Sequence, residues 1–205
     1  GGQVQRASVQ PALGLASAIV TFSGPVPLER ARREIAARYP GAAISPNWLY
    51  RFAQTLPARP RIYAAALVGD PGPGRCRLAR PVRIGMIDGP VNTDHPALRA
   101  ARVRAESLVA GQPVPVADHG TAVAVLIAGE DPSGILAGFA RGAELHAVEV
   151  FTLEGGRDAT TVERVIAAIE LLAARDVQVI NMSFSGPRSP AMQQALAAAA
   201  GRGIV

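Results

Sequence analysis

Two polar residues, Asp88 and His119, stand 31 positions apart, and each adjoins an apolar segment that would hold its side chain in place. A histidine that acts as a base needs one ring nitrogen within about 3 Å of the proton that it removes. Its other ring nitrogen needs a carboxylate, which fixes the tautomer and stabilises the imidazolium. Asp88 and His119 are therefore candidates for the acid and the base of a hydrolase with a serine nucleophile.

Each residue alone also has a simpler explanation. An acid after a buried strand can cap a helix, form a turn or bind a ribose, and a histidine beside an apolar helix is often structural. The sequence has no G-x-G-x-x-G or G-x-x-x-x-G-K motif, which disfavours a nucleotide-binding domain. We interpret His95 as a turn residue and His146 as a core residue, and with His119 they lack zinc-ligand spacing. We predict no cofactor, although a structural calcium ion stays an open alternative.

The elements that would position this pair alternate between strands and helices. Short apolar runs predict strands over 82–87, 145–150 and 177–182, and helical spacing predicts helices over 119–129, 160–175 and 190–200, with a cap at residue 160 or 161. This alternation predicts an α/β fold with a doubly wound parallel sheet. Chemistry in such folds lies at the carboxyl ends of the strands, and Asp88 occupies such an end.

Residues 1–52 are predicted to form a separate small α/β unit. A strand over 18–23, a helix over 28–39 and an extended segment over 42–52 predict a β-α-β arrangement. The proline-rich residues 53–81 predict a linker to a larger domain over 82–205.

The two parts of the chain differ in the sign of their charge. Residues 1–80 carry 11 arginines and three acidic residues, whereas residues 81–205 carry 10 arginines and 13 acidic residues. No aromatic stacking pattern accompanies the arginines, so we predict no nucleic-acid partner. Complementary charge predicts instead that the basic part docks on the acidic part, and that high salt weakens this docking.

Composition limits the membrane and redox alternatives. No apolar run reaches the ~20 residues that a membrane helix needs, so we predict no membrane span. The apolar residues 12–20 lack the flanks of a signal peptide. Cys76 is the only cysteine, which excludes an internal disulfide, and we interpret it as a buried, unreactive thiol.

Three motifs together resemble those of the subtilisin-like serine proteases. The segment Ile-Gly-Met-Ile-Asp at 84–88, continuing to Asp-His-Pro-Ala-Leu at 94–98, resembles their aspartate motif. The segment His-Gly-Thr-Ala-Val-Ala at 119–124 resembles their histidine motif, and Val-Ile-Asn-Met-Ser-Phe-Ser-Gly at 179–186 resembles their substrate-binding strand and turn. The resemblance covers about residues 82–205, with Asp before His as in the subtilisin order.

The resemblance implies roles for these residues and a place for the protein. Asp88 would orient His119, which would act as general base and then as general acid. The substrate-binding residues Ser183, Phe184, Ser185 and Gly186 would pair with an extended peptide or protein substrate, and the loop 155–159 would form the opposite wall. Residues 1–52 resemble part of an inhibitory propeptide, and the family implies a secreted or periplasmic protein. Three residues depart from the usual motifs: Gly89 replaces a hydroxyl residue, Ala122 a histidine and Ser185 a glycine.

The third member of the triad is not recognisable in the sequence. None of the nine serines lies in a Gly-Thr-Ser or G-x-S-x-G context, and residues 1–205 do not include the strand that would carry the oxyanion-hole asparagine of the family. We therefore expect a fragment of a serine endopeptidase that supplies Asp and His only and is inactive alone. A missing C-terminal part, on the same or a separate chain, would be its partner. The alternative is a pseudoprotease, a peptide-binding module without the nucleophile.

Overall fold

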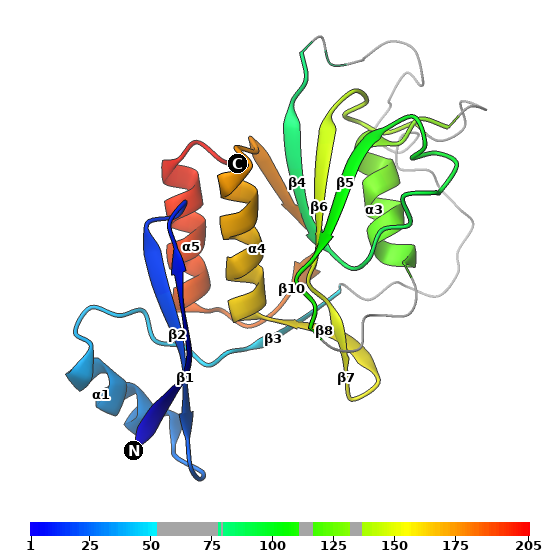
Figure 1. Ribbon diagram of the computed structural model, residues 1–205. Coiled ribbons are helices and arrows are strands. Elements are labelled where there is room, and N and C mark those ends of the chain that lie inside the picture. The colour runs from blue at the N-terminus through cyan, green and yellow to red at the C-terminus, as the bar shows by residue number, and fades with distance from the viewer. Residues whose placement is uncertain (53–77, 79, 111–116, 132–136) are drawn as a thin grey trace.

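The computed structural model describes residues 1–52, 78, 80–110, 117–131 and 137–205 (Figure 1). The predicted linker over 53–81, including Cys76, lies almost entirely outside these residues. No helix within the described part of the chain is long and apolar enough to cross a membrane.

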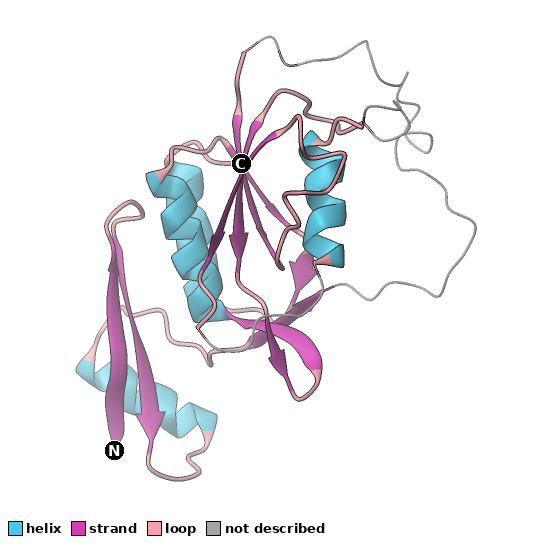
Figure 2. Ribbon diagram, turned by 45° about the vertical axis from the view of Figure 1, so that its right-hand side comes forward, coloured by secondary structure: helices cyan, strands magenta, loops and turns pink. Residues whose placement is uncertain are grey.

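The larger predicted domain is built on a four-stranded parallel sheet. Its strands are β4 (Arg83–Asp88), β5 (Arg102–Ser107), β6 (Glu144–Glu149) and β9 (Val179–Met182), in the order β5-β6-β4-β9. Helix α3 (Asp118–Ala128) covers one face, and helices α4 (Val162–Ala174) and α5 (Pro190–Gly201) cover the other (Figures 1 and 2). Helices on both faces of a parallel sheet confirm the predicted doubly wound α/β fold.

Alternate residues of β4 face the two helical layers. Ile84 and Met86 pack in the apolar cluster on the α3 side, whereas Ile87 packs in the cluster formed with α4 and α5. Gly85 also faces α4, where an added Cβ would lie 2.7 Å from Leu172 Cδ1. Glycine at this position therefore lets α4 lie close to the sheet.

The helices α4 and α5 begin at hydroxyl residues that cap them. Thr161 Oγ1 accepts a hydrogen bond from the Arg164 N–H (3.3 Å), and Ser189 Oγ accepts one from the Met192 N–H (3.3 Å). Such a cap typically stabilises a helix by about 1 kcal/mol. The predicted cap before the helix at 162 is confirmed.

Residue Val205 continues the sheet beside β9. Its N–H donates to Gln178 O (3.0 Å), and its carbonyl accepts from the Ile180 N–H (2.8 Å). The apolar residues 204–205 therefore lie in register with the neighbouring strand.

The N-terminal residues do not form the predicted β-α-β unit. Strands β1 (Gly2–Gln10) and β2 (Leu15–Phe22) pair as an antiparallel hairpin, followed by α1 (Leu28–Arg38). Strand β3 (Leu49–Phe52) does not join β2 but pairs with strands from the second half of the chain. The apolar pattern located β3 but carries no information on which strand it pairs with, because its partners are distant in sequence.

Strand β3 lies inside a second, antiparallel sheet. The order is β10 (Phe184–Ser185), β3, β8 (Arg157–Thr161) and β7 (Thr152–Glu154), as Figure 1 shows. Gly155 and Gly156 join β7 to β8 with positive φ angles of 59° and 75°, which glycine adopts without strain. The predicted loop at 155–159 is therefore the turn and the first part of a β-hairpin strand.

The N-terminal hairpin contacts helix α4 through its turn. The backbone N–H groups of Ala12 and Leu13 donate to the two carboxylate oxygens of Glu170 (2.8 and 2.9 Å), and Leu13 is buried in the α4–α5 core. Farther along the hairpin, Arg6 forms an ion pair with Glu163 (2.6 Å). The contact between the β1–β2 hairpin and α4 thus includes a buried apolar residue and hydrogen bonds from backbone groups as well as an ion pair. Charge complementarity therefore accounts for only part of the docking of the N-terminal residues.

Candidate active site

Asp88 and His119 lie in direct contact where β4 ends and α3 begins. His119 Nδ1 is 2.8 Å from Asp88 Oδ1, and the Gly89 N–H donates to the same oxygen at 2.7 Å. Asp88 is fully buried, whereas the His119 side chain is 29% exposed. The two residues that sequence reasoning selected are thus brought together, with the imidazole accessible from one side.

Glycine at position 120 makes this contact possible. An added Cβ at Gly120 would lie 2.5 Å from Pro90 O and 2.6 Å from Gly89 O, so only glycine lets the first turn of α3 approach the loop after Asp88. Thr121 Oγ1 accepts a hydrogen bond from the Asn92 N–H of the same loop (2.9 Å). Helix and loop therefore hold each other in place beside the His119 ring.

The buried carboxylate of Asp88 is held through one of its two oxygens. Oδ2 is buried and has no hydrogen-bond partner among the described residues. Burial raises the pKa of Asp88 above its usual value, while the hydrogen bonds from His119 and Gly89 favour the ionised form and lower it. Position 89 is glycine in this chain, where the family motif usually has a residue with a hydroxyl group. The absence of that hydroxyl is consistent with the lack of a hydrogen-bond partner for Asp88 Oδ2.

The segment 183–186, predicted to bind substrate, lies beside an extended strand of the same chain. Phe184 and Ser185 form β10, which pairs antiparallel with Phe52 and Arg51 of β3. Ser183 Oγ instead accepts a hydrogen bond from Asn181 Nδ2 (2.9 Å) and lies outside this pairing.

Gly186 completes the segment by making room for an aromatic ring. A Cβ at Gly186 would overlap the ring of Tyr50, whose hydroxyl donates to Pro187 O (3.0 Å). On the other side of β3, Leu49 and Tyr50 pair with Thr161 and Thr160 of β8. The segments predicted as the two walls, β10 and the β7–β8 hairpin, therefore flank one extended strand.

Two aromatic residues that sequence reasoning missed adjoin the pair. The Phe52 ring stacks on the His119 imidazole with a centroid distance of 4.0 Å and on the Phe151 ring at 3.9 Å. Phe184 contacts Phe151 edge-on at 5.5 Å. Aromatic residues at strand ends were the only signal for these contacts, and that signal does not identify partners.

The side chains of the other two histidines have other partners. His95 lies in the turn after β4, where its Nδ1 accepts a hydrogen bond from the Ala97 N–H (3.2 Å). His146 is buried on β6, as predicted, with its Nε2 3.3 Å from Glu144 Oε1. Within the described ranges, no group of three or more His, Cys, Asp or Glu side chains is placed to hold a metal ion.

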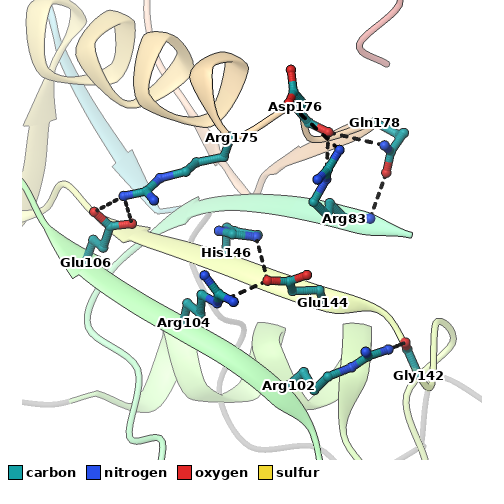
Figure 3. Close-up of polar contacts among 10 residues, drawn as sticks. All are labelled: Arg83, Arg102, Arg104, Glu106, Gly142, Glu144, His146, Arg175, Asp176 and Gln178. Carbon is teal, nitrogen blue, oxygen red and sulfur yellow. Dashed lines mark hydrogen bonds and ion pairs between the residues drawn. The ribbon is translucent and has the colours of Figure 1, made fainter. Parts of the chain in front are cut away.

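A second polar cluster surrounds His146 on the α4 face of the sheet (Figure 3). Arg104 Nε lies 3.0 Å from the Glu144 oxygen that His146 faces, and Arg175 binds Glu106 at 3.0 Å. Burial lowers the pKa of His146 below its usual 6.5, and the Glu144 charge partly opposes this effect. Glu144 begins β6, whereas His146 is in register with Gly85 and Glu106 is level with Ile87, so the cluster runs along the α4 face of the strands.

Comparison with known proteins places the chain in a family. A profile of the Subtilase family matches residues 79–205, more than half of the chain. The chain belongs to the subtilase family. Subtilisin DY from Bacillus licheniformis is 32% identical over 127 residues, which cover 60% of this chain and 44% of that subtilisin. The match therefore spans less than half the length of this subtilase relative.

Solved structures share the fold of this subtilase chain. The epidermin leader peptide processing serine protease EpiP from Staphylococcus aureus aligns with a TM-score of 0.54 and 19% identity, over 95% of this chain and 52% of EpiP. The prenylagaramide maturation protease PagA aligns with a TM-score of 0.50 and 22% identity, over 60% of this chain and 44% of PagA. At these identities the likeness concerns the fold, and with EpiP it extends into the N-terminal residues.

Proposed function

We propose that this subtilase chain supplies the acid and the base of an Asp-His-Ser triad in a serine endopeptidase. The observation that carries the proposal is the 2.8 Å contact between His119 Nδ1 and the buried Asp88 carboxylate. An imidazole that donates its Nδ1 proton to a carboxylate leaves Nε2 unprotonated, which is the form that a general base needs.

The proposed roles follow from this geometry. His119 takes the proton from the serine hydroxyl as it attacks the peptide carbonyl, and then gives it to the leaving amine. Asp88 stays ionised and stabilises the imidazolium. The nucleophile and the oxyanion-hole donor are assigned to the C-terminal part of the complete protein, so activity is proposed for that protein and not for residues 1–205 alone.

Peptide substrates are proposed to bind as β3 does. An extended peptide that takes the place of β3 would form backbone hydrogen bonds with Phe184 and Ser185 on one side and with β8 on the other, which is recognition by strand addition. Substrate residues near the scissile bond would then lie beside His119.

Residues 1–52 are proposed to act as an inhibitory propeptide. In support, β3 occupies the proposed substrate track, and Phe52 covers one face of the His119 ring. The Glu170 contact with the hairpin turn anchors the same unit on α4. Deletion of residues 1–60 from the complete protein should change its folding or its activity, and a deletion with no effect on either would contradict inhibition.

Hydrolysis of fluorogenic peptides by the complete protein tests the enzymatic proposal. Wild type should cleave, and His119→Ala should lose nearly all activity. His95→Gln serves as the matched control, because the His95 ring accepts a hydrogen bond from the Ala97 N–H, whereas the His119 ring bonds to Asp88. Wild-type inactivity toward a broad peptide library would count against a protease.

A peptide-binding module without catalysis is the second candidate function. The pairing of β3 with β8 and β10 favours it, since this pairing needs no nucleophile. A complete protein that binds extended peptides and cleaves none would support this candidate. We also propose a secreted or periplasmic location, which fractionation of the producing cells would test.

A further inference from the structure

The Phe52 side chain lies in a flat slot beside the proposed base. Its ring is nearly parallel to the His119 imidazole, at 23°, and to the Phe151 ring, at 21°, with centroid distances of 4.0 and 3.9 Å. Two rings at such distances cannot share one face of a phenyl ring without overlapping. Phe52 is therefore sandwiched, with the imidazole on one face and Phe151 on the other.

The walls of this slot are held in place by residues around them. Phe151 is fully buried, and Phe184 packs against it at an interplanar angle of 71°. His119 is fixed by its hydrogen bond to Asp88. The distance between the two walls is therefore set by the fold and matches the thickness of one aromatic ring.

Gly89 leaves the edge of the slot open. An added Cβ at Gly89 would lie 3.2 Å from Phe52 Cζ, closer than an ordinary van der Waals contact. Any larger residue at position 89 would push against the far end of the phenyl ring. Glycine thus gives the slot the depth that a six-membered ring requires.

We propose that this slot is the subsite for the substrate side chain that lies over the catalytic base, and that it selects an aromatic residue. The proposal rests on the proposed function, in which a substrate strand replaces β3 and its corresponding residue replaces Phe52. Phe151 and Gly89 are then specificity-determining residues.

The shape of the slot explains the selection. A ring fills a narrow gap between two parallel rings and stacks on both, and each stacked pair favours an aromatic residue by roughly two- to tenfold beyond its buried area. A branched aliphatic side chain is thicker than a ring and would force the walls apart. Alanine would leave the slot empty and forfeit contacts on both faces.

The first experiment uses the 205-residue chain and needs no catalysis. Hydrogen exchange of the backbone amides at 49–52 reports how firmly β3 is docked, and the amides of β4 and β6 report whether the variant stays folded. Phe52→Leu and Phe52→Ala should each lose about tenfold or more in protection relative to wild type. Leu49→Ala is the matched control on the same strand, because Leu49 is 41% exposed and outside the slot.

A substitution at Gly89 tests the wall in the same assay. When position 52 is the native Phe, Gly89→Ala should lower the protection of the amides at 49–52 against hydrogen exchange. In the Phe52→Ala variant, Gly89→Ala should leave that protection unchanged, since only a ring at position 52 reaches the added methyl group. If the amides at 49–52 were equally protected with Phe, Leu or Ala at position 52, the proposal would be overturned. An equal effect of Gly89→Ala in both backgrounds would also overturn it.

The second experiment uses the complete protein and peptides Leu-Tyr-Arg-X followed by a varied residue and a fluorogenic group. The ratio of kcat/KM for X = Phe over X = Leu should be about ten, and Gly89→Ala should reduce that ratio. Cleavage with no preference for an aromatic X would overturn the subsite proposal and leave the protease assignment standing. Absence of all cleavage, with the aromatic ranking intact in hydrogen exchange, would overturn the protease assignment and support an aromatic subsite in a binding module.

Discussion

His119 Nδ1 lies 2.8 Å from Asp88 Oδ1, whereas the second oxygen of the same carboxylate, Oδ2, is buried without a hydrogen-bond partner among the described residues. The charge of Asp88 is therefore stabilised through one oxygen, by His119 and by the Gly89 N–H. Burial raises the pKa of Asp88. Because the proposed role needs the ionised form, activity should be lost as the pH falls through this raised pKa.

Replacement of Asp88 by asparagine tests the orienting role. Asp88→Asn in the complete protein should keep the fold and lower kcat by a factor on the order of 10⁴, because an amide favours the wrong imidazole tautomer. The measurement is kcat on a fluorogenic peptide, with circular dichroism as the control for folding. A loss of less than tenfold would show that Asp88 does not act through His119.

Glu170 should anchor the N-terminal hairpin. Its carboxylate accepts from two backbone N–H groups, those of Ala12 and Leu13, and hydrogen bonds to a charged group contribute about 1.5–3 kcal/mol each. Glu170→Ala should therefore weaken hairpin docking by about 2 kcal/mol or more, measured by hydrogen exchange at 2–22. Glu163→Ala is the matched control on the same helix, since it removes an exposed ion pair with Arg6 and should cost less than about 1 kcal/mol. The reverse order would show that charge dominates the docking.

Gly186 should be required for β3 to occupy its place. Gly186→Ala would overlap the Tyr50 ring and should weaken β3 docking by about 1–3 kcal/mol, seen as faster exchange at 49–52. Gly201→Ala, where an added Cβ meets no atom within 4 Å, should leave that exchange unchanged and stabilise α5 by up to about 1 kcal/mol. Unchanged exchange in Gly186→Ala would contradict the position of β3.

His146 should make the fold sensitive to acid. Its pKa in the folded chain is lowered by burial, so the unfolded chain binds the proton more readily. Neutral His146 therefore makes its full contribution to the free energy of unfolding above pH 6.5. This contribution is lost as the pH falls below that value, and the free energy of unfolding decreases by at most about 1.4 kcal/mol per pH unit. Urea unfolding of His146→Gln from pH 7 to 5 should show a shallower loss than wild type. Parallel curves would contradict this account.

The sheet and the acid–base pair could be predicted because their signals are local. Strands buried on both faces, such as β4, read as apolar runs, and Gly120 beside His119 already indicated a close backbone approach. Strand β5 escaped prediction because it lies at the sheet edge, where charged residues such as Arg102 and Arg104 protect exposed backbone. Strand β1 escaped because it is exposed along nearly its whole length.

The place of β3 could not be predicted, for a physical reason. Residues 49–52 have the pattern of a strand, but their partners at 157–161 and 184–185 lie more than 100 positions away. Pairing over such distances depends on complementary packing, here Tyr50 over Gly186 and Phe52 against Phe151. The aromatic slot depends on the same packing and is visible only in three dimensions.

Labelling of the complete protein with a fluorophosphonate tests the central claim most directly, because this reagent reacts with a serine activated by a general base. Wild type should be labelled at a serine outside residues 1–205, and His119→Gln should reduce the labelling rate at least about a hundredfold. His95→Gln should be labelled at the wild-type rate. Equal labelling of wild type and His119→Gln, or no labelling of wild type, would contradict the assignment of His119 as the catalytic base.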